Sequence, residues 1–412
     1  MRRITRLLAL VLPLVLVASN SYAAVKPGSV CKKAGQISTV SGKKYTCVKK
    51  GKALVWDKGV VVKAAPAKVP APAPVPAPSP SPSPSPSIAT PTPSPTPTFI
   101  PPARPTSFSD LLEKVDGISY WAWATSSEKV KNASEPSIEV EALFGPNTPM
   151  IEHNTLRAVQ LVSKLYSGAP APKKVVAIYF SFDDRAWGQS TFGKYAYRPS
   201  GNEAVNMCQT RLTCWGGLAE IDYKGTGILF MSVNDPGRID KAHTSGPMQA
   251  HEFAHTFQVT QFLGTPKQPD TYCCVKQHLP WWTVEGGALY VEASALNSGS
   301  YEDYKAWMNK AYSDFKGNDK DKFTKAWFEN FLQPPTTSLW GTEPYRWKIY
   351  SGGALAEEVF VALKGPDISM KLMRDVATGL TWPESFEKNF GISWSNALPI
   401  LSETLVAMIA KS

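Results

Sequence analysis

His251-Glu252-Phe253-Ala254-His255 holds two of the five histidines in this 412-residue chain, one helical turn apart. Residues i and i+4 lie on one face of an α-helix, so both imidazoles can contact the same metal ion. Glu252 is turned aside from that pair, where its carboxylate can take a proton from a water molecule that zinc has made more acidic. Two histidines flanking a glutamate at this spacing rarely arise by chance. The alternative is a purely structural role, in which both histidines are hydrogen-bonded within a buried helix. The stretch therefore predicts a zinc-binding helix with a general base beside the ion.

A third ligand has to come from farther along the chain. The three-histidine signature needs Gly at position 258 and His at position 261, and both are Gln. Residues 279–292 read Leu-Pro-Trp-Trp-Thr-Val-Glu-Gly-Gly-Ala-Leu-Tyr-Val-Glu. HEFAHTFQ followed by W-x-x-E-G-x-A-x-Y-x-E resembles the gluzincins, zinc peptidases whose third ligand is a glutamate on a second helix, and among them the aminopeptidase-N-like branch and its peptidase MA-like relatives. The resemblance covers residues 248–292 and implies that Glu285 completes the site of a single Zn²⁺.

Two more residues extend this site. Glu292 follows Glu285 by two helical turns on the same face, where it can accept a hydrogen bond from a ligand histidine or remain an ordinary exposed carboxylate. The resemblance also implies a tyrosine that stabilises the oxyanion of the reaction, because Tyr350 and Gly353 match the Y-x-x-G pattern of the family. We therefore expect Tyr350 to be catalytic, with Tyr345 as the reserve candidate.

The chain departs from the family pattern in two respects. The interval between His255 and Glu285 holds 29 residues, longer than is usual, and it includes Cys273-Cys274. The G-x-M-E-N segment with which the aminopeptidases bind the free amine of a substrate is missing. Aminopeptidase specificity therefore does not carry over, and an endopeptidase is favoured.

Apolar periodicity predicts an α+β domain over residues 107–412. A helix at Asn154–Tyr166 and strands at 175–180 and 227–233 come first, and after residue 247 the pattern is almost wholly helical. Together with the resemblance, this implies a thermolysin-like zincin domain in which a mixed α/β lobe precedes a mostly helical lobe. The expected helices of the second lobe are 248–262, 284–296, 301–314, 347–363, 367–377 and 395–410.

Three segments precede this domain. Residues 1–23 have a basic start, an apolar run and a small-residue exit, which is typical of a secretory signal peptide. Residues 24–65 form a small basic module whose short strands need a Cys31–Cys47 disulfide to hold together. Residues 66–106 contain 17 Pro, which predicts an extended, disordered linker rich in Pro, Ser, Thr and Ala.

The six cysteines agree with export, because disulfides persist outside the cytoplasm. Cys208, Cys214, Cys273 and Cys274 allow three pairings, and no CxxC spacing favours a second zinc site made of thiolates. The N-terminal apolar run is too short to span a bilayer, so no stable membrane insertion is expected after signal cleavage. We expect the mature chain to be secreted or associated with the cell wall.

The net charge of +10 belongs to the N-terminal part of the chain. Residues 24–63 hold ten Lys and one Asp, and residues 107–412 are mildly acidic. A nucleic-acid partner for the large domain is therefore not expected. The lysine-rich module favours an anionic cell-wall polymer as its partner, and a solvated surface without a partner is the alternative.

These features lead to two hypotheses of different classes. The first is a secreted zinc metallopeptidase that hydrolyses peptide or protein substrates with Glu252 as the general base. The second is a non-catalytic cell-surface binding or scaffold protein on a peptidase-like fold, which the long linker and the missing amine anchor favour. The intact ligands and base favour the enzyme.

Overall fold

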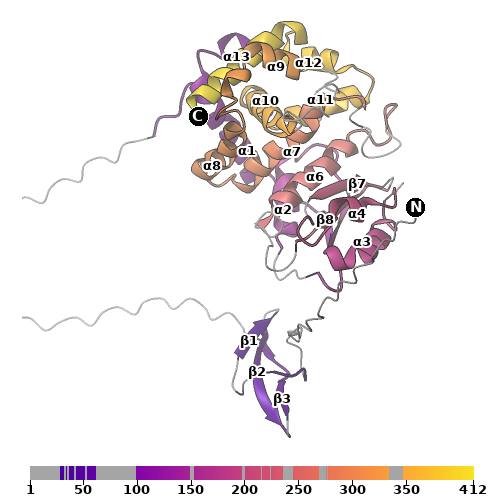
Figure 1. Ribbon diagram of the computed structural model, residues 1–412. Coiled ribbons are helices and arrows are strands. Elements are labelled where there is room, and N and C mark those ends of the chain that lie inside the picture. The colour runs from indigo at the N-terminus through magenta and orange to yellow at the C-terminus, as the bar shows by residue number, and fades with distance from the viewer. Residues whose placement is uncertain are drawn as a thin grey trace, which may run out of the picture. The chain divides into compact units, whose positions relative to one another are not determined.

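The chain divides between Ser94 and Pro95 into two compact units (Figure 1). The predicted signal peptide, most of the proline-rich linker, Tyr345 and the Cys273-Cys274 pair lie outside the residues that the structure describes. The computed structural model describes residues 28–31, 34, 37–40, 43–51, 53–61, 99–148, 153–196, 200–214, 216–222, 224–234, 245–268, 275, 277–333 and 347–412.

The small unit is a four-stranded antiparallel sheet in which β2 pairs with each of the other strands. The predicted disulfide between Cys31 and Cys47 is confirmed, and with Tyr45 and Trp56 it makes up the buried core. Because four buried side chains stabilise a sheet only weakly, the disulfide contributes much of the stability of this unit. The strands are β1 (Ile37–Val40), β2 (Lys43–Lys50), β3 (Ala53–Trp56) and β4 (Val60–Val61).

The large unit contains a second four-stranded sheet, with the strand order β5-β6-β8-β7. Three strands are parallel, and β7 runs antiparallel to β8 at the edge. The predicted strands at 175–180 and 227–233 are confirmed as β6 and β8, whereas β5 and β7 have no counterpart in the sequence predictions. The bounds are β5 (Glu139–Phe144), β6 (Lys174–Phe180), β7 (Gly217–Ile221) and β8 (Thr226–Ser232).

The two central strands are buried on both faces because they are almost wholly apolar. Since successive side chains alternate between the faces, Val175 contributes to the main core and Ile178 to a smaller core beneath α3 (Arg185–Phe192) and α4 (Glu203–Met207). A disulfide between Cys208 and Cys214 lies in this smaller core, and it is one of the pairings that the sequence left open.

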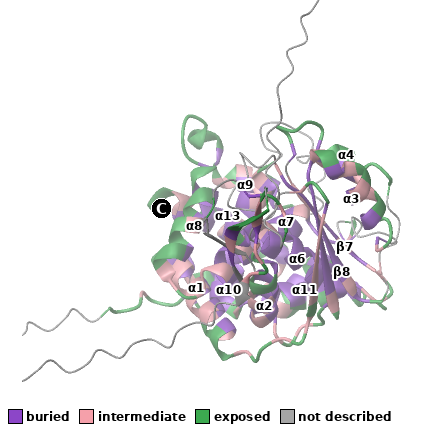
Figure 2. Cartoon of the chain, turned by 90° about the horizontal axis from the view of Figure 1, so that it is seen from below, coloured by how far each residue is buried: buried purple, intermediate pink, exposed green. Residues whose placement is uncertain are grey.

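Three helices form the buried centre of the large unit: α6 (Pro247–Thr260), α7 (Trp281–Leu296) and α10 (Lys348–Lys364) (Figure 2). α6 packs against both the sheet and α7, and α7 packs on α10. The predicted helices are confirmed, although α7 begins at Trp281 instead of 284, directly after Pro280 at the N-cap. The surrounding helices are α1 (Val115–Asn132), α2 (Thr155–Leu165), α8 (Tyr301–Ser313), α9 (Lys325–Phe331), α11 (Ile368–Ala377), α12 (Trp382–Phe390) and α13 (Trp394–Lys411). The expected mixture of α and β structure is thereby confirmed.

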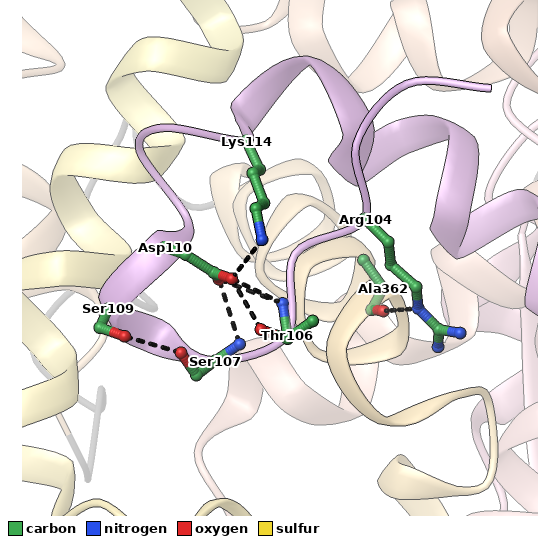
Figure 3. Close-up of polar contacts among 7 residues, drawn as sticks. All are labelled: Arg104, Thr106, Ser107, Ser109, Asp110, Lys114 and Ala362. Carbon is green, nitrogen blue, oxygen red and sulfur yellow. Dashed lines mark hydrogen bonds and ion pairs between the residues drawn. The ribbon is translucent and has the colours of Figure 1, made fainter. Parts of the chain in front are cut away.

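The chain is fastened to the large unit before α1 begins (Figure 3). Asp110 accepts a hydrogen bond from the backbone N–H of Thr106 at 3.1 Å, and Lys114 Nζ donates to it at 2.8 Å. Burial tends to raise the pKa of Asp110, but these hydrogen bonds outweigh it and lower the pKa well below its usual range. Arg104 Nε donates to the carbonyl of Ala362 on α10 at 3.4 Å. The end of the predicted linker, from residue 99 on, is therefore part of the large unit.

Membrane-spanning helices were sought among the described residues. No single helix there has the length and hydropathy that a membrane span needs. The pair α12 and α13 passes that test only when taken together, and the two helices meet at a bend of 77°.

Candidate metal centre

The helix that carries the two histidines is buried on all sides. Gly246 adopts a left-handed conformation (φ 110°) immediately before α6, and Pro247 opens the helix. Every residue of α6 except Met248 is buried, because the helix lies between the sheet and α7. Buried polar side chains require partners, so the polar residues of α6 define where chemistry can occur.

The three predicted ligands converge from α6 and α7. The Nε2 atoms of His251 and His255 lie 3.5 and 3.3 Å from Glu285 Oε2, and one ligand atom of each residue falls within 4.8 Å of the others. Ligands at roughly 2.0–2.1 Å from a tetrahedral zinc ion are separated from one another by about 3.3 Å. All three side chains are buried. The group could therefore hold one metal ion and leave a fourth position for a reactant.

The charge of this group also favours a cation. Burial on its own lowers the pKa of His251, but hydrogen bonds with Glu285 and Glu292 outweigh it and raise the pKa well above its usual value. The carboxylates of Glu252, Glu285 and Glu292 are all largely buried and surround the imidazoles of the two histidines. Uncompensated negative charge in a buried site is costly, and a divalent cation among these groups would offset it.

Glu292 takes the first of the two roles that the sequence left open, because it contacts His251. Its Oε1 is 2.7 Å from His251 Nδ1, so the imidazole donates to the carboxylate and directs Nε2 toward Glu285. Two aromatic side chains of α7, those of Trp282 and Tyr290, lie in the core. Trp282 Nε1 donates to the carbonyl of Leu332 at 3.3 Å, and the Tyr290 hydroxyl donates to the carbonyl of Ala122 at 3.1 Å. Both residues therefore hold α7 in place.

His255 has a partner that the sequence analysis did not identify. Gln258, one turn later on α6, places Oε1 at 2.8 Å from His255 Nδ1 and donates from Nε2 to the carbonyl of Val284 at 2.8 Å. The i, i+3 spacing on one helix is a signal that was present in the sequence. The contact with Val284 could not be predicted from the sequence, because it depends on how α6 packs against α7.

Glu252 is buried beside the edge strand of the sheet, with 5 % of its surface exposed. Burial raises the pKa of Glu252, and the charges of His251 and His255 oppose that rise. A Cβ atom on Gly217 of β7 would lie 2.2 Å from Glu252 Oε1, so a larger residue there would displace the Glu252 side chain. A buried carboxylate with a raised pKa beside a metal site has the properties of a general base.

Tyr350, in the first turn of α10, lies next to His251. The two ring centroids are 5.9 Å apart with an interplanar angle of 28°, and the ring centroid of Trp347 lies 5.8 Å from that of Tyr350. Trp347 is 46 % exposed. The aromatic rings therefore lead from the surface of the protein to the predicted ligands.

A close crossing of α7 and α10 fixes this position of Tyr350. A Cβ on Gly353 would lie 2.0 Å from the carbonyl oxygen of Trp282, and a Cβ on Gly286 would lie 2.2 Å from the carbonyl carbon of Gly353. The backbones touch because both residues lack a side chain. Gly286 and Gly353 thus serve helix packing one turn from Tyr350.

A cavity of about 380 Å³ adjoins the group on the side of Glu292. Its lining is apolar at Met248, Leu289, Trp307 and Met308 and carries charged groups at Glu292, Lys310 and Asp314, with Ser351 beside them. Ser351 follows Tyr350 in the sequence, and Glu292 contacts His251. The cavity is therefore lined by a residue that contacts the predicted ligand His251 and by the neighbour of Tyr350 in the sequence.

Comparison with known proteins provides no relative for this chain. No family description, no curated protein and no solved structure matches it. The arrangement of His251, His255 and Glu285 is therefore the main evidence for what the site does.

Proposed function

We propose that the chain is a zinc metallopeptidase of the gluzincin type, with a thermolysin-like catalytic domain, that hydrolyses peptide bonds. The observation that carries the proposal is the buried group of His251, His255 and Glu285 with the carboxylate of Glu252 beside it. The donor set of two imidazoles and one carboxylate is that of catalytic zinc sites, which keep one position open. A zinc ion bound there would polarise a carbonyl group and make a water molecule more acidic.

The residues of the chain supply the proton transfers. Glu252 accepts a proton from the attacking water at its carboxylate and then delivers it to the nitrogen of the leaving amine. Its raised pKa, caused by burial, makes the carboxylate a stronger base for the first of these steps. The Tyr350 hydroxyl donates a hydrogen bond to the oxygen of the scissile carbonyl as negative charge develops on it.

Two features favour a peptide as the substrate. Among the described strands, β7 pairs only with β8, so its outer edge can form backbone hydrogen bonds with an extended peptide next to Glu252. The partly apolar cavity beside Glu292 has room for an apolar side chain of the substrate. An edge strand accepts a chain that continues in both directions, which agrees with the expected endopeptidase action.

The N-terminal unit belongs to the proposal as a targeting module. Export and binding of an anionic cell-wall polymer through residues 24–65 remain predictions from the sequence. The Cys31–Cys47 and Cys208–Cys214 disulfides are compatible with an extracellular location.

A peptide-library digestion tests the proposed activity. Purified full-length protein loaded with zinc is incubated with peptides whose ends are either free or blocked, and the fragments are identified by mass spectrometry. We expect internal cleavage of both sets by the wild type and none by Glu252→Gln. Cleavage of only the peptides with a free amine would refute the endopeptidase, and no cleavage at all would favour the binding or scaffold protein.

A further inference from the structure

Gln258 occupies a position that joins both ligand-bearing helices. It lies on α6, is 1 % exposed, and contacts His255 on its own helix and Val284 on α7. Val284 immediately precedes the predicted ligand Glu285. One carboxamide therefore connects a ligand on the first helix to the backbone beside a ligand on the second.

The hydrogen bonds determine which way the carboxamide points. A carbonyl oxygen can only accept, so the group 2.8 Å from the carbonyl of Val284 must be the NH₂ of Gln258. The oxygen of the amide then faces His255, and because it also only accepts, His255 Nδ1 must carry the proton. In the neutral imidazole the lone pair then lies on Nε2, the nitrogen 3.3 Å from Glu285 Oε2 that a metal ion would contact.

The neighbouring helix leaves room for this side chain. A Cβ on Gly287 would lie 3.4 Å from Gln258 Nε2, so the carboxamide packs directly against the α7 backbone at this point. Gly287 lies two residues after Glu285, and Val284 lies one residue before it. The contact therefore spans the same turn of α7 that presents the carboxylate.

We propose that Gln258 is a positioning residue of the metal centre, which holds His255 in the tautomer that binds a metal and fixes the distance between His255 and Glu285. The inference rests on the proposed zinc site but not on peptidase activity. Hydrogen-bonded partners of metal ligands typically contribute roughly 10- to 100-fold to metal affinity.

The test compares three variants of the full-length protein. Gln258→Met is similar in size and removes both hydrogen bonds. Gln258→Glu keeps an acceptor for His255 Nδ1 and removes the donor to Val284. Gln261→Met is the matched control, because Gln261 caps the C-terminus of the same helix, is 1 % exposed and donates to the carbonyls of Pro170 and Phe257, away from the ligands.

Two measurements on each variant decide the matter: the zinc dissociation constant by competition with a chelator, and the tautomer of His255 in the metal-free protein by ¹⁵N NMR. We expect Gln258→Met to bind zinc roughly 10- to 100-fold more weakly and to lose the pure Nδ1–H tautomer. We expect Gln258→Glu to keep the tautomer and lose less affinity, and Gln261→Met to keep both properties. Equal zinc affinity in Gln258→Met and Gln261→Met would overturn the inference, as would a wild-type protein without affinity for zinc. A chain that binds zinc as expected but cleaves no peptide would refute the proposed function and leave this inference intact.

Discussion

Gly353→Ala is expected to destabilise the large unit by about 2 kcal/mol, because the added methyl group collides with backbone atoms at the crossing of α7 and α10. The Cβ would lie 2.0 Å from the Trp282 carbonyl oxygen and 2.9 Å from Gly286 Cα. Close carbon–oxygen contacts are normally about 3.3 Å or longer, so the two helices would have to separate by about 1 Å.

The magnitude follows from two opposing effects. Overpacking a buried site costs about 1–3 kcal/mol, and the upper value applies here because no change of rotamer can move a backbone atom. Alanine gains about 1 kcal/mol over glycine within a helix, which leaves a net loss of about 2 kcal/mol.

Urea unfolding followed by tryptophan fluorescence, with linear extrapolation to zero denaturant, measures the difference. Gly299→Ala is the control, since no atom lies within 4 Å of a Cβ at Gly299, and we expect its stability to stay within about 0.5 kcal/mol of the wild type. Equal stability of the two variants would refute the reasoning about the glycine crossing.

Three further predictions concern single side chains. Tyr350→Phe should lower kcat by roughly 10²- to 10³-fold with little change in zinc content, measured by steady-state peptide hydrolysis, and an unchanged kcat would remove Tyr350 from the mechanism. Glu292→Gln should weaken zinc binding by roughly 10- to 100-fold in chelator competition, because the hydrogen bond to His251 loses its charge, and an unchanged affinity would contradict that role. Burial raises the pKa of Glu357 from 4.5 to about 8, so the folded protein binds a proton that the unfolded chain releases. Its contribution to stability is therefore full below pH 4.5 and is lost as the pH rises toward about 8; Glu357→Gln should flatten the stability–pH curve in that window, and an unchanged curve would assign the dependence to other groups.

Much of the helical half and the candidate site follows from local patterns. The 3.6-residue periodicity predicts α6, α7 and α10, and the spacing within α6 places His251 and His255 on one face. Glu285 required the family resemblance, since a single glutamate on an apolar helix has no spacing of its own to mark it.

What the sequence did not reveal depends on contacts between distant segments. β7 is five residues long with no clear alternation, and it becomes a strand because β8 offers it an edge. The close approach of Gly217 to the Glu252 carboxylate depends on this strand pairing and could not be predicted from the sequence. Gln258 was read only as a departure from the three-histidine signature, whereas its bond to Val284 depends on the packing of α6 against α7.

The central claim is that Glu252 acts as the base of a hydrolytic zinc site. Its most direct test is the ratio of kcat/KM between the wild type and Glu252→Gln on one peptide, with the zinc content of both proteins measured in the same samples. We predict one zinc ion per chain in each protein and a fall in kcat/KM of at least about 10²-fold in the variant. Equal activity at equal zinc content, or a wild-type protein that holds no zinc, would contradict the account.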